Sequence, residues 1–339
     1  MTKKELGIIK KGFSPLYIKY LEEICNHNKI NFVIFENTPT DEVISQFDYI
    51  ISDTQCLPKY CNIVHSFPKL YRDEQYPNKL YGNLLKIHHL PDHFKNAQVF
   101  KSSSKIVVVS SLIKDYIVKA YKIAPEKIVV AYPGKGECSG DEFKTFDYAS
   151  DIFTIGISAV GFVSKGGYIL LDALKEFKKL FPNVRIKAKI IYPNYEKNLA
   201  VKLYLKSCGL GDIVEILGYQ KNIGEFYKKC HCFICPSLFE AFGRVVPEAM
   251  STHRPVIIGS KVGAIDIIKD GINGYVFEMD KYSNRNLALK IKEVYDKYNS
   301  LEDLTQSGYE TSNNLTWRNF AYQVIKGLYP EEKIILSEE

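Results

Sequence analysis

The feature that most constrains the fold of this chain is the alternation of short β-branched runs with longer amphipathic stretches. Asn31–Phe35 and Lys105–Ser110 are typical of buried strands, whereas Pro15–Cys25 and Ser111–Tyr121 have the apolar spacing of helices. The rhythm returns at Phe153–Ser158, which opens a second series of the same kind. Alternation of strands and helices predicts an α/β architecture, with parallel sheets covered by helices on both faces.

The two series, in a chain of 339 residues, predict two doubly wound Rossmann-like domains. Gly, Ser and acidic residues interrupt the pattern around Cys138–Ser150, and the chain beyond residue 280 has a helical pattern to about Leu328. We therefore expect domains at 1–145 and 146–310, followed by a helical segment at 311–339. Within the second domain, helices are expected near Tyr168–Leu180 and Glu196–Cys208, and strands at Arg185–Tyr192, Ile213–Leu217, Cys232–Cys235, Pro255–Gly259 and Gly274–Phe277. Open α/β sheets bind ligands beyond the carboxyl ends of their strands, so function is sought in the loops that follow strands.

Charge and hydropathy exclude several classes of protein. The net charge of +6 divides evenly, because residues 1–150 and 151–339 each carry +3, and we expect no nucleic-acid partner. No run approaches the roughly 18 apolar residues of a membrane span. Near the N-terminus only Leu6–Ile9 is apolar, which predicts a cytoplasmic protein. Peripheral contact with an anionic membrane is an alternative to a solvated face for the basic residues Lys3, Lys4, Lys10 and Lys11.

One cysteine cluster resembles a metal or redox site at first sight. Cys230, Cys232 and Cys235 flank His231, but their spacing is not that of paired zinc ligands and no matching Cys or His pair follows. The run is apolar and ends at Pro236, as a buried strand would. We therefore interpret these cysteines as small buried hydrophobic residues and expect no metal there.

The glycine motifs give a weak indication of anion binding. No G-x-G-x-x-G follows a predicted strand, and Gly161 to Gly166 lacks the Lys that a phosphate-binding P-loop needs. Ser164–Gly167, however, follows a predicted strand and leads into a helix. Glycines at a helix start let backbone N–H groups approach an anion, and Lys165 adds a compact charge. The alternative is a turn before the helix with a solvated Lys.

Two glutamates in one loop and helix carry a stronger signal. After the strand Cys232–Cys235, Glu240 lies in a strand-to-helix loop, and Glu248 lies in the first turns of the next helix. Pro247 is tolerated only in an opening turn, which places the start of that helix. A helix N-terminus attracts phosphate, and carboxylates accept hydrogen bonds from sugar hydroxyls. The alternative is that Glu240 is exposed and Glu248 merely favours the positive end of the helix.

The segment from Glu240 to Glu248, EAFGRVVPE, resembles the E-x7-E motif of retaining GT-B glycosyltransferases of family 4, the glycosyl transferases group 1 type. Trp317 and Phe320 resemble the family's C-terminal helix, which crosses back to the first domain. Other segments similar to the family are Lys105–Gly134, Ile155–Leu174, Leu217–Leu238, Arg254–Ile258 and Asp270–Phe277. The resemblance implies a GT-B fold, in which two Rossmann-like domains face a central cleft.

The resemblance also implies roles for the matching residues. Glu240 would contact the transferred sugar, Glu248 would accept hydrogen bonds from ribose hydroxyls, and Lys165 would hold the diphosphate leaving group. His65 matches a His near the acceptor and the donor sugar, and the alternative for it is a polar residue at a strand end. The other donor-binding residues implied are Phe242, Gly243, Gly166, Gly12 and Arg244. Fixed positive charge and helix-end amides replace a metal in this fold, so neither a divalent cation nor another cofactor is expected.

The chain departs from the family pattern at one position that matters for the diphosphate. Val160 stands five residues before Lys165, where the family usually has an Arg. Lys10, Lys11 and Arg244 are the candidates to supply the missing charge. Smaller departures are Ala241 for the usual Gly, a shortened segment at Gly263–Asp266, and a reduced first glycine loop at Lys10–Ser14.

The resemblance implies a retaining, hexosyltransferase-type enzyme. It would move a sugar from a nucleotide diphosphate sugar to a hydroxyl of a saccharide or lipid-linked acceptor. One alternative is a degenerate GT-B domain that binds a nucleotide sugar or a partner without transfer, which the missing Arg motivates. A further alternative is a sugar-nucleotide epimerase, whose product forms without an acceptor.

Overall fold

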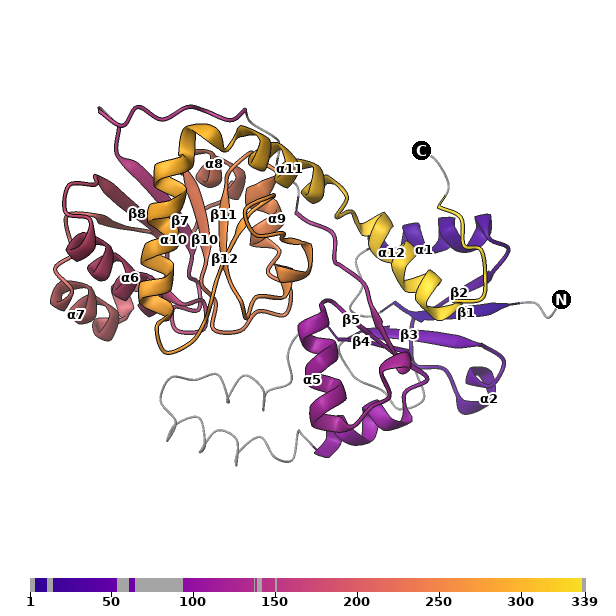
Figure 1. Cartoon of the computed structure of the whole chain (residues 1–339). Helices are drawn as coiled ribbons and strands as arrows, with labels where there is room; N and C mark the ends of the chain where they lie inside the picture. The colour runs from indigo at the N-terminus through magenta and orange to yellow at the C-terminus, as the bar shows by residue number, and fades with distance from the viewer. Residues whose placement is uncertain are drawn as a thin grey trace. The chain divides into compact units, whose positions relative to one another are not determined.

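The computed structural model describes residues 4–10, 15–53, 61–64, 94–136, 138, 142–149 and 151–336. The chain divides into two compact units (Figure 1). Unit 1 comprises Met1–Gly134 together with Leu315–Glu339, and unit 2 comprises Lys135–Asn314. The domain boundaries expected from the sequence were 145 and 310, whereas the units divide after Gly134 and Asn314.

Unit 1 is built on a six-stranded sheet in which every recorded strand pair is parallel. The strand order is β2-β1-β3-β4-β5-β6. The strands are β1 (Glu5–Ile9), β2 (Asn31–Phe35), β3 (Tyr49–Asp53), β4 (Cys61–Val64), β5 (Lys105–Val108) and β6 (Ile128–Val130). The β4 run CNIV is buried throughout, as expected for a parallel strand covered on both faces.

The helices of unit 1 include one from the far end of the chain. In the described part of this unit the helices are α1 (Pro15–His27), α2 (Asp41–Ile44), α5 (Ser111–Tyr121), the 3-10 turn η1 (Pro125–Lys127) and α12 (Trp317–Leu328), and residues 94–102 are also helical. Helix α12 packs against α1 and β6. The Phe320 ring of α12 lies 5.2 Å from the Tyr17 ring of α1, and both are buried. The C-terminal helix therefore completes the core of the first unit.

Unit 2 repeats the plan with a second six-stranded parallel sheet, in the order β12-β11-β10-β7-β8-β9. Its strands are β7 (Phe153–Ser158), β8 (Ile186–Ile191), β9 (Val214–Leu217), β10 (Cys232–Cys235), β11 (Val256–Gly259) and β12 (Tyr275–Phe277). Alternate residues of β10 enter different cores: Cys232 and Ile234 join one cluster, and Phe233 and Cys235 join the other. This alternation is what the period of two in a strand dictates when both faces are covered.

Helices cover both faces of the second sheet. The elements are α6 (Gly167–Leu180), η2 (Tyr195–Lys197), α7 (Leu199–Ser207), α8 (Ile223–Lys228), α9 (Val245–Met250), η3 (Gly263–Ile267), α10 (Ser283–Lys297), η4 (Tyr298–Ser300) and α11 (Glu302–Asn313). Helices α6 and α10 pack side by side (Figure 1). Their apolar residues line the cluster that contains Ile234, whereas those of α8 and α9 line the cluster that contains Phe233.

Most of the predicted elements are present. The strands at Asn31–Phe35, Phe153–Ser158 and Cys232–Cys235 have the predicted bounds. The helix predicted near Glu196–Cys208 begins later than expected, at Leu199. Asn198 caps it, because its side chain accepts the Val201 N–H at 3.1 Å. Helix α2 was not predicted, because it has no buried residue and therefore lacks an apolar pattern.

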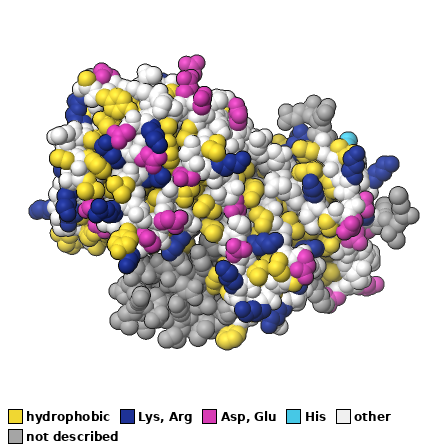
Figure 2. All heavy atoms as spheres, viewed as in Figure 1, with side chains coloured by type: hydrophobic (Ala, Val, Ile, Leu, Met, Phe, Trp, Pro, Cys, Tyr) yellow, Lys and Arg dark blue, Asp and Glu magenta, His cyan; other side chains and the backbone are white. Residues whose placement is uncertain are grey.

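One face of the molecule agrees with the even spread of charge in the sequence. Figure 2 shows Lys and Arg interspersed with Asp and Glu, and with apolar side chains, over the visible face. Among the residues that the structure describes, no helix is both long and apolar enough to cross a membrane.

Candidate functional site

The structure brings two of the predicted residues, Lys165 and Glu240, into direct contact. Lys165 follows β7 and Glu240 follows β10, and these strands are neighbours in the parallel sheet. The Lys165 Nζ forms an ion pair with Glu240 Oε2, and Ser237 Oγ lies 3.5 Å from the same carboxylate oxygen. The Glu240 side chain is about one-fifth exposed, at 19%, so the pair lies partly out of water. A cation and a carboxylate thus meet where a ligand of an open α/β sheet is expected.

Gly166 allows this contact because it has no side chain. Its φ of +73° is left-handed, and a Cβ there would lie 1.9 Å from the carbonyl oxygen of Pro236. Next to this close approach, the Leu238 N–H donates to the Ser164 carbonyl at 2.9 Å, which joins the two loops. Gly166 is also the N-cap of α6, so the partial positive charge of that helix end lies beside Lys165.

The loop that carries Glu240 is also held from its other side. Glu240 and Val262 form an isolated parallel bridge, in which the Gly263 N–H donates to the Glu240 carbonyl at 2.9 Å. The Ala264 N–H donates to the Phe242 carbonyl at 2.6 Å. Gly243 has a φ of +91°, and this left-handed turn leads into α9. The backbone on both sides of the Glu240 carboxylate is therefore fixed by the segment after β11.

Glu248 lies in α9, as predicted, and its carboxylate has partners on both oxygens. The Gly136 N–H donates to Oε1 at 3.2 Å, and the Tyr227 hydroxyl donates to Oε2 at 3.3 Å. Arg244 Nη2 is 3.8 Å from Oε1. Burial raises the pKa of Glu248, while the Arg244 charge and the Gly136 and Tyr227 hydrogen bonds act in the opposite direction. Pro247 is the third residue of α9, within its opening turn as the sequence pattern required.

The arrangement can bind a ligand that is anionic at one end and rich in hydroxyls at the other. Lys165, Arg244 and the N-terminus of α6 supply positive charge. Glu240 and Glu248 supply carboxylate oxygens, which accept hydrogen bonds from hydroxyls. Lys165 and Glu240 neutralise each other in this structure. A ligand that binds here must therefore replace part of their ion pair with contacts from its own polar groups.

The structure describes two of the three candidates for the charge that is missing at Val160. Val160 is exposed, and Lys10, one candidate, pairs with Glu36 at 2.8 Å in unit 1. Arg244, another candidate, is beside Glu248. The predicted residues His65, Gly12 and Lys11 lie outside the described residues.

Sequence reasoning missed three groups that shape this site. Tyr227 and Gly136 contact Glu248, and the Pro236 carbonyl meets Gly166. The signal for Gly136 is its place in a Gly-Lys-Gly segment just before the interruption at Cys138–Ser150, and Tyr227 stands between Phe226 and two lysines. Neither signal names a partner, because all three contacts join residues that are distant in the sequence.

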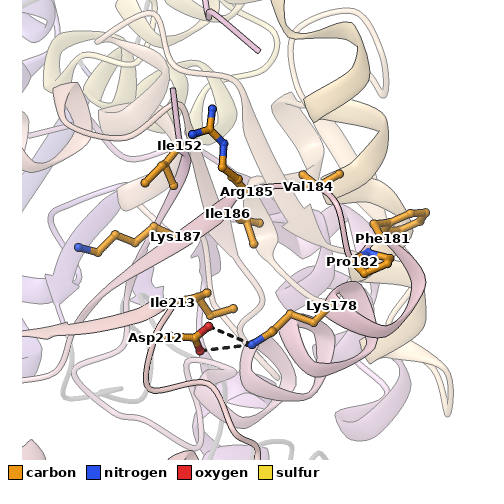
Figure 3. Close-up of a pocket in the computed structure, with 10 residues that line it drawn as sticks. All are labelled: Ile152, Lys178, Phe181, Pro182, Val184, Arg185, Ile186, Lys187, Asp212 and Ile213. Carbon is orange, nitrogen blue, oxygen red and sulfur yellow. Dashed lines mark hydrogen bonds and ion pairs between the residues drawn. The ribbon is translucent and has the colours of Figure 1, made fainter. Parts of the chain in front are cut away.

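A cavity of about 340 Å³ lies at the other edge of the second sheet (Figure 3). It opens at the amino ends of β7, β8 and β9, whereas Lys165 and Glu240 follow the carboxyl ends of their strands. Its lining residues are Ile152, Lys178, Phe181, Pro182, Val184, Arg185, Ile186, Lys187, Asp212 and Ile213. Lys178 pairs with Asp212 at 3.1 Å and Lys187 pairs with Glu215 at 3.0 Å, so these lysines are already engaged by carboxylates. This cavity is not part of the candidate site.

Comparison with known proteins identifies the family of the second unit. Residues 151–311 match the family model described as Glycosyl transferases group 1, and this segment contains Lys165, Glu240 and Glu248. Unit 2 carries a glycosyl transferases group 1 domain. Solved structures that resemble the chain over nearly its whole length are GT-B glycosyltransferases, and the fold of this protein is GT-B. The resemblance noted in the sequence is therefore confirmed at the level of the family for residues 151–311 and at the level of the fold for the chain.

Relatives of this GT-B protein extend the match over most of its length. The chain is 27% identical to "Uncharacterized glycosyltransferase MJ1178" of Methanocaldococcus jannaschii, covering 88% of this chain and 85% of the relative. It is 24% identical to "Lipopolysaccharide 1,2-N-acetylglucosaminetransferase" of Salmonella typhimurium, covering 89% and 80%. Among solved structures, Anabaena Alr3699/HepE in complex with UDP and glucose matches with a TM-score of 0.63 at 17% identity, covering 97% of this chain and 100% of that one. The family match over residues 151–311 and the two glycosyltransferase relatives support sugar transfer as the activity.

Proposed function

We propose that this GT-B protein is a retaining glycosyltransferase that uses a nucleotide diphosphate sugar as donor. The observation that carries the proposal is the contact between Lys165 and Glu240, because it joins a cation and a carboxylate at the carboxyl edge of the second sheet. Glu248, the second carboxylate, follows in α9 with both oxygens oriented by neighbours. Matched site residues support function more strongly than the fold does.

Each charged residue takes one part of the donor in this proposal. Lys165 and the N-terminus of α6 hold the diphosphate and offset the charge that grows on it as the glycosidic bond breaks. Glu240, next to Lys165, receives hydroxyls of the sugar, with Phe242 and Gly243 beside it. Glu248 receives the ribose hydroxyls, and Arg244 lies at the same carboxylate. Gly166 keeps the two loops close enough for one donor to touch both.

The transfer step requires only the donor and an acceptor hydroxyl. The acceptor oxygen forms a bond to the anomeric carbon on the face from which the diphosphate departs, and its proton passes to the leaving phosphate. The electron pair of the broken bond stays on the nucleoside diphosphate. Fixed positive charge of the protein neutralises the departing diphosphate, so the proposal includes no divalent metal and no cofactor. The acceptor remains a saccharide or a lipid-linked saccharide, and the localisation remains the cytoplasm predicted from sequence.

The donor is tested first by binding. Thermal melting is followed with UDP, GDP, ADP, CDP and dTDP sugars, because a ligand at 100 times its Kd adds about 2.7 kcal/mol of stability. HepE binds UDP and UDP-glucose, so the UDP sugars lead the panel. Lys165→Met is expected to lose the shift, whereas Lys178→Met, which removes a lysine at the opposite edge of the sheet, keeps it.

Turnover then separates transfer from binding alone. Release of nucleoside diphosphate that depends on an added acceptor supports the transferase. A sugar nucleotide that is altered without an acceptor supports the epimerase, and binding without either reaction supports a degenerate domain, which the exposed Val160 in place of Arg favours. If no member of the panel binds, the proposal is refuted.

A further inference from the structure

The carboxylate of Glu248 is held by two groups that both precede it in the chain, one 112 positions earlier and the other 21 positions earlier. The Gly136 N–H, from the first residues of unit 2, donates to Oε1 at 3.2 Å. The hydroxyl of Tyr227, from α8, donates to Oε2 at 3.3 Å. Each oxygen therefore has one hydrogen-bond donor from the protein, and each keeps acceptor capacity for another, because an ionised carboxylate has about four lone-pair sites.

Tyr227 is packed in the core, which fixes the position of its hydroxyl. The residue is 0% exposed, and its ring meets the Phe233 ring of β10 edge to face, with centroids 5.0 Å apart. The pKa of Tyr227 is raised well above its usual value by burial and by the Glu248 charge, so the hydroxyl keeps its proton. A buried, protonated hydroxyl beside a carboxylate is a permanent donor to it.

Gly136 meets the same carboxylate so closely that it leaves no room for a side chain. A Cβ at residue 136 would lie 2.7 Å from Glu248 Oε1 and 3.6 Å from Arg244 Nη2. The φ of Gly136 is not left-handed, so the backbone itself would accept another residue. The glycine is therefore required by its distance from Glu248 and not by its backbone conformation.

We propose that Tyr227 and Gly136 are positioning residues that aim the Glu248 carboxylate at the ribose of the donor, and that they set the preference for ribonucleotides over nucleotides without ribose hydroxyls. The inference rests on the proposed function. A carboxylate fixed by two bonds does not have to be ordered when the ligand binds, so more of its interaction with the ribose appears as affinity. Without ribose hydroxyls, the ligand gains nothing from this alignment.

The test compares Kd values for UDP and GDP with those for their 2′,3′-dideoxy counterparts by titration calorimetry. Tyr227→Phe removes one hydroxyl and keeps the buried ring, and Gly136→Ala pushes on Oε1 while keeping the backbone N–H. Each variant is expected to weaken binding of the ribonucleotide about tenfold, roughly the value of one hydrogen bond to a charged group. Binding of the dideoxynucleotide should be unchanged.

Matched controls carry the same substitutions away from Glu248. Tyr204→Phe removes a hydroxyl that donates to Asp172 at 2.6 Å, and Gly211→Ala adds a Cβ with nothing within 4 Å. Both should bind ribonucleotide and dideoxynucleotide as the unaltered protein does. The pH profile gives a second readout: loss of the Tyr227 bond raises the pKa of Glu248 further, so the acidic limit of ribonucleotide binding moves to higher pH in Tyr227→Phe.

The outcomes distinguish this inference from the proposed function. If the variants weaken both nucleotides equally, or neither, the positioning role is refuted while the proposed donor site stands. If the unaltered protein binds nucleotides without preferring the ribose form, the ribose-binding role that the proposed function gives to Glu248 fails together with this inference. If the unaltered protein binds no nucleoside diphosphate, the proposed function fails and this inference fails with it.

Discussion

The close approach at Gly166 allows a severe and specific perturbation of the site. In Gly166→Ala, the new Cβ would lie 1.9 Å from the Pro236 carbonyl oxygen and 2.6 Å from its carbon. These are backbone atoms, so no side-chain rotation relieves the overlap. The φ of +73° must also be kept by a residue that disfavours it. The loop after β7 and the loop after β10 must therefore separate, and with them Lys165 and Glu240.

The expected loss of stability has three parts. The left-handed backbone costs an alanine about 1–2 kcal/mol. Forcing atoms into a packed contact costs about 1–3 kcal/mol. The smaller conformational freedom of alanine in the unfolded chain returns about 0.4–1 kcal/mol. Gly166→Ala should therefore lower the free energy of unfolding by about 1–5 kcal/mol.

Two other glycines of the same unit separate these contributions. Gly209 has a φ of +65° and nothing within 4 Å of the position that a Cβ would take, so Gly209→Ala carries the backbone cost alone. Gly211 has neither feature, and Gly211→Ala should be neutral or slightly stabilising. Urea denaturation followed by circular dichroism, analysed for the transition of unit 2, ranks the three variants. A loss in Gly166→Ala no greater than in Gly209→Ala would refute the reasoning from the Pro236 contact.

Two further predictions concern a half-buried histidine and two buried cysteines of unit 2. The His231 Nδ1 accepts the Thr154 N–H at 2.8 Å, and burial lowers the pKa of His231, with the Arg254 charge acting in the same direction and Asp151 opposing it. Because the unfolded chain binds the proton first, stability should be full above the unfolded pKa of about 6.5 and decrease as the pH falls below it. Urea midpoints measured across this range give the dependence of stability on pH. The variant His231→Phe should be less stable at neutral pH but should show a weaker pH dependence. An unchanged pH dependence would contradict the role given to His231. Burial raises the pKa of Cys230 to about 12 and of Cys235 to about 11. Iodoacetamide should therefore modify partly exposed Cys208 before either of them in the native protein, as mass spectrometry of peptides would show; early labelling at Cys230 or Cys235 would contradict their burial.

The architecture could be predicted from the sequence because local patterns encode it. The strand at Cys232–Cys235 and the helix at Ser111–Tyr121 have the predicted bounds, since apolar spacing distinguishes the two elements wherever a segment is buried. The pattern failed at α2, whose side chains meet no core. The motif from Glu240 to Glu248 also pointed to the family that the comparison confirms for residues 151–311.

Which residues touch could be learned only from the folded chain. Lys165 and Glu240 are 75 positions apart, and Gly136 and Glu248 are 112 apart, so no local pattern relates either pair. In the sequence, Gly166 is simply a glycine before a helix. A glycine is needed there because the Pro236 carbonyl lies so close, and only the pairing of β7 with β10 brings that carbonyl near. Hydrophobic periodicity specifies which face of an element is buried, whereas the contacts of a site depend on sheet order and on the lengths of loops. Most elements of this protein were therefore predictable from its sequence, whereas the partners of Glu240 and Glu248 were not.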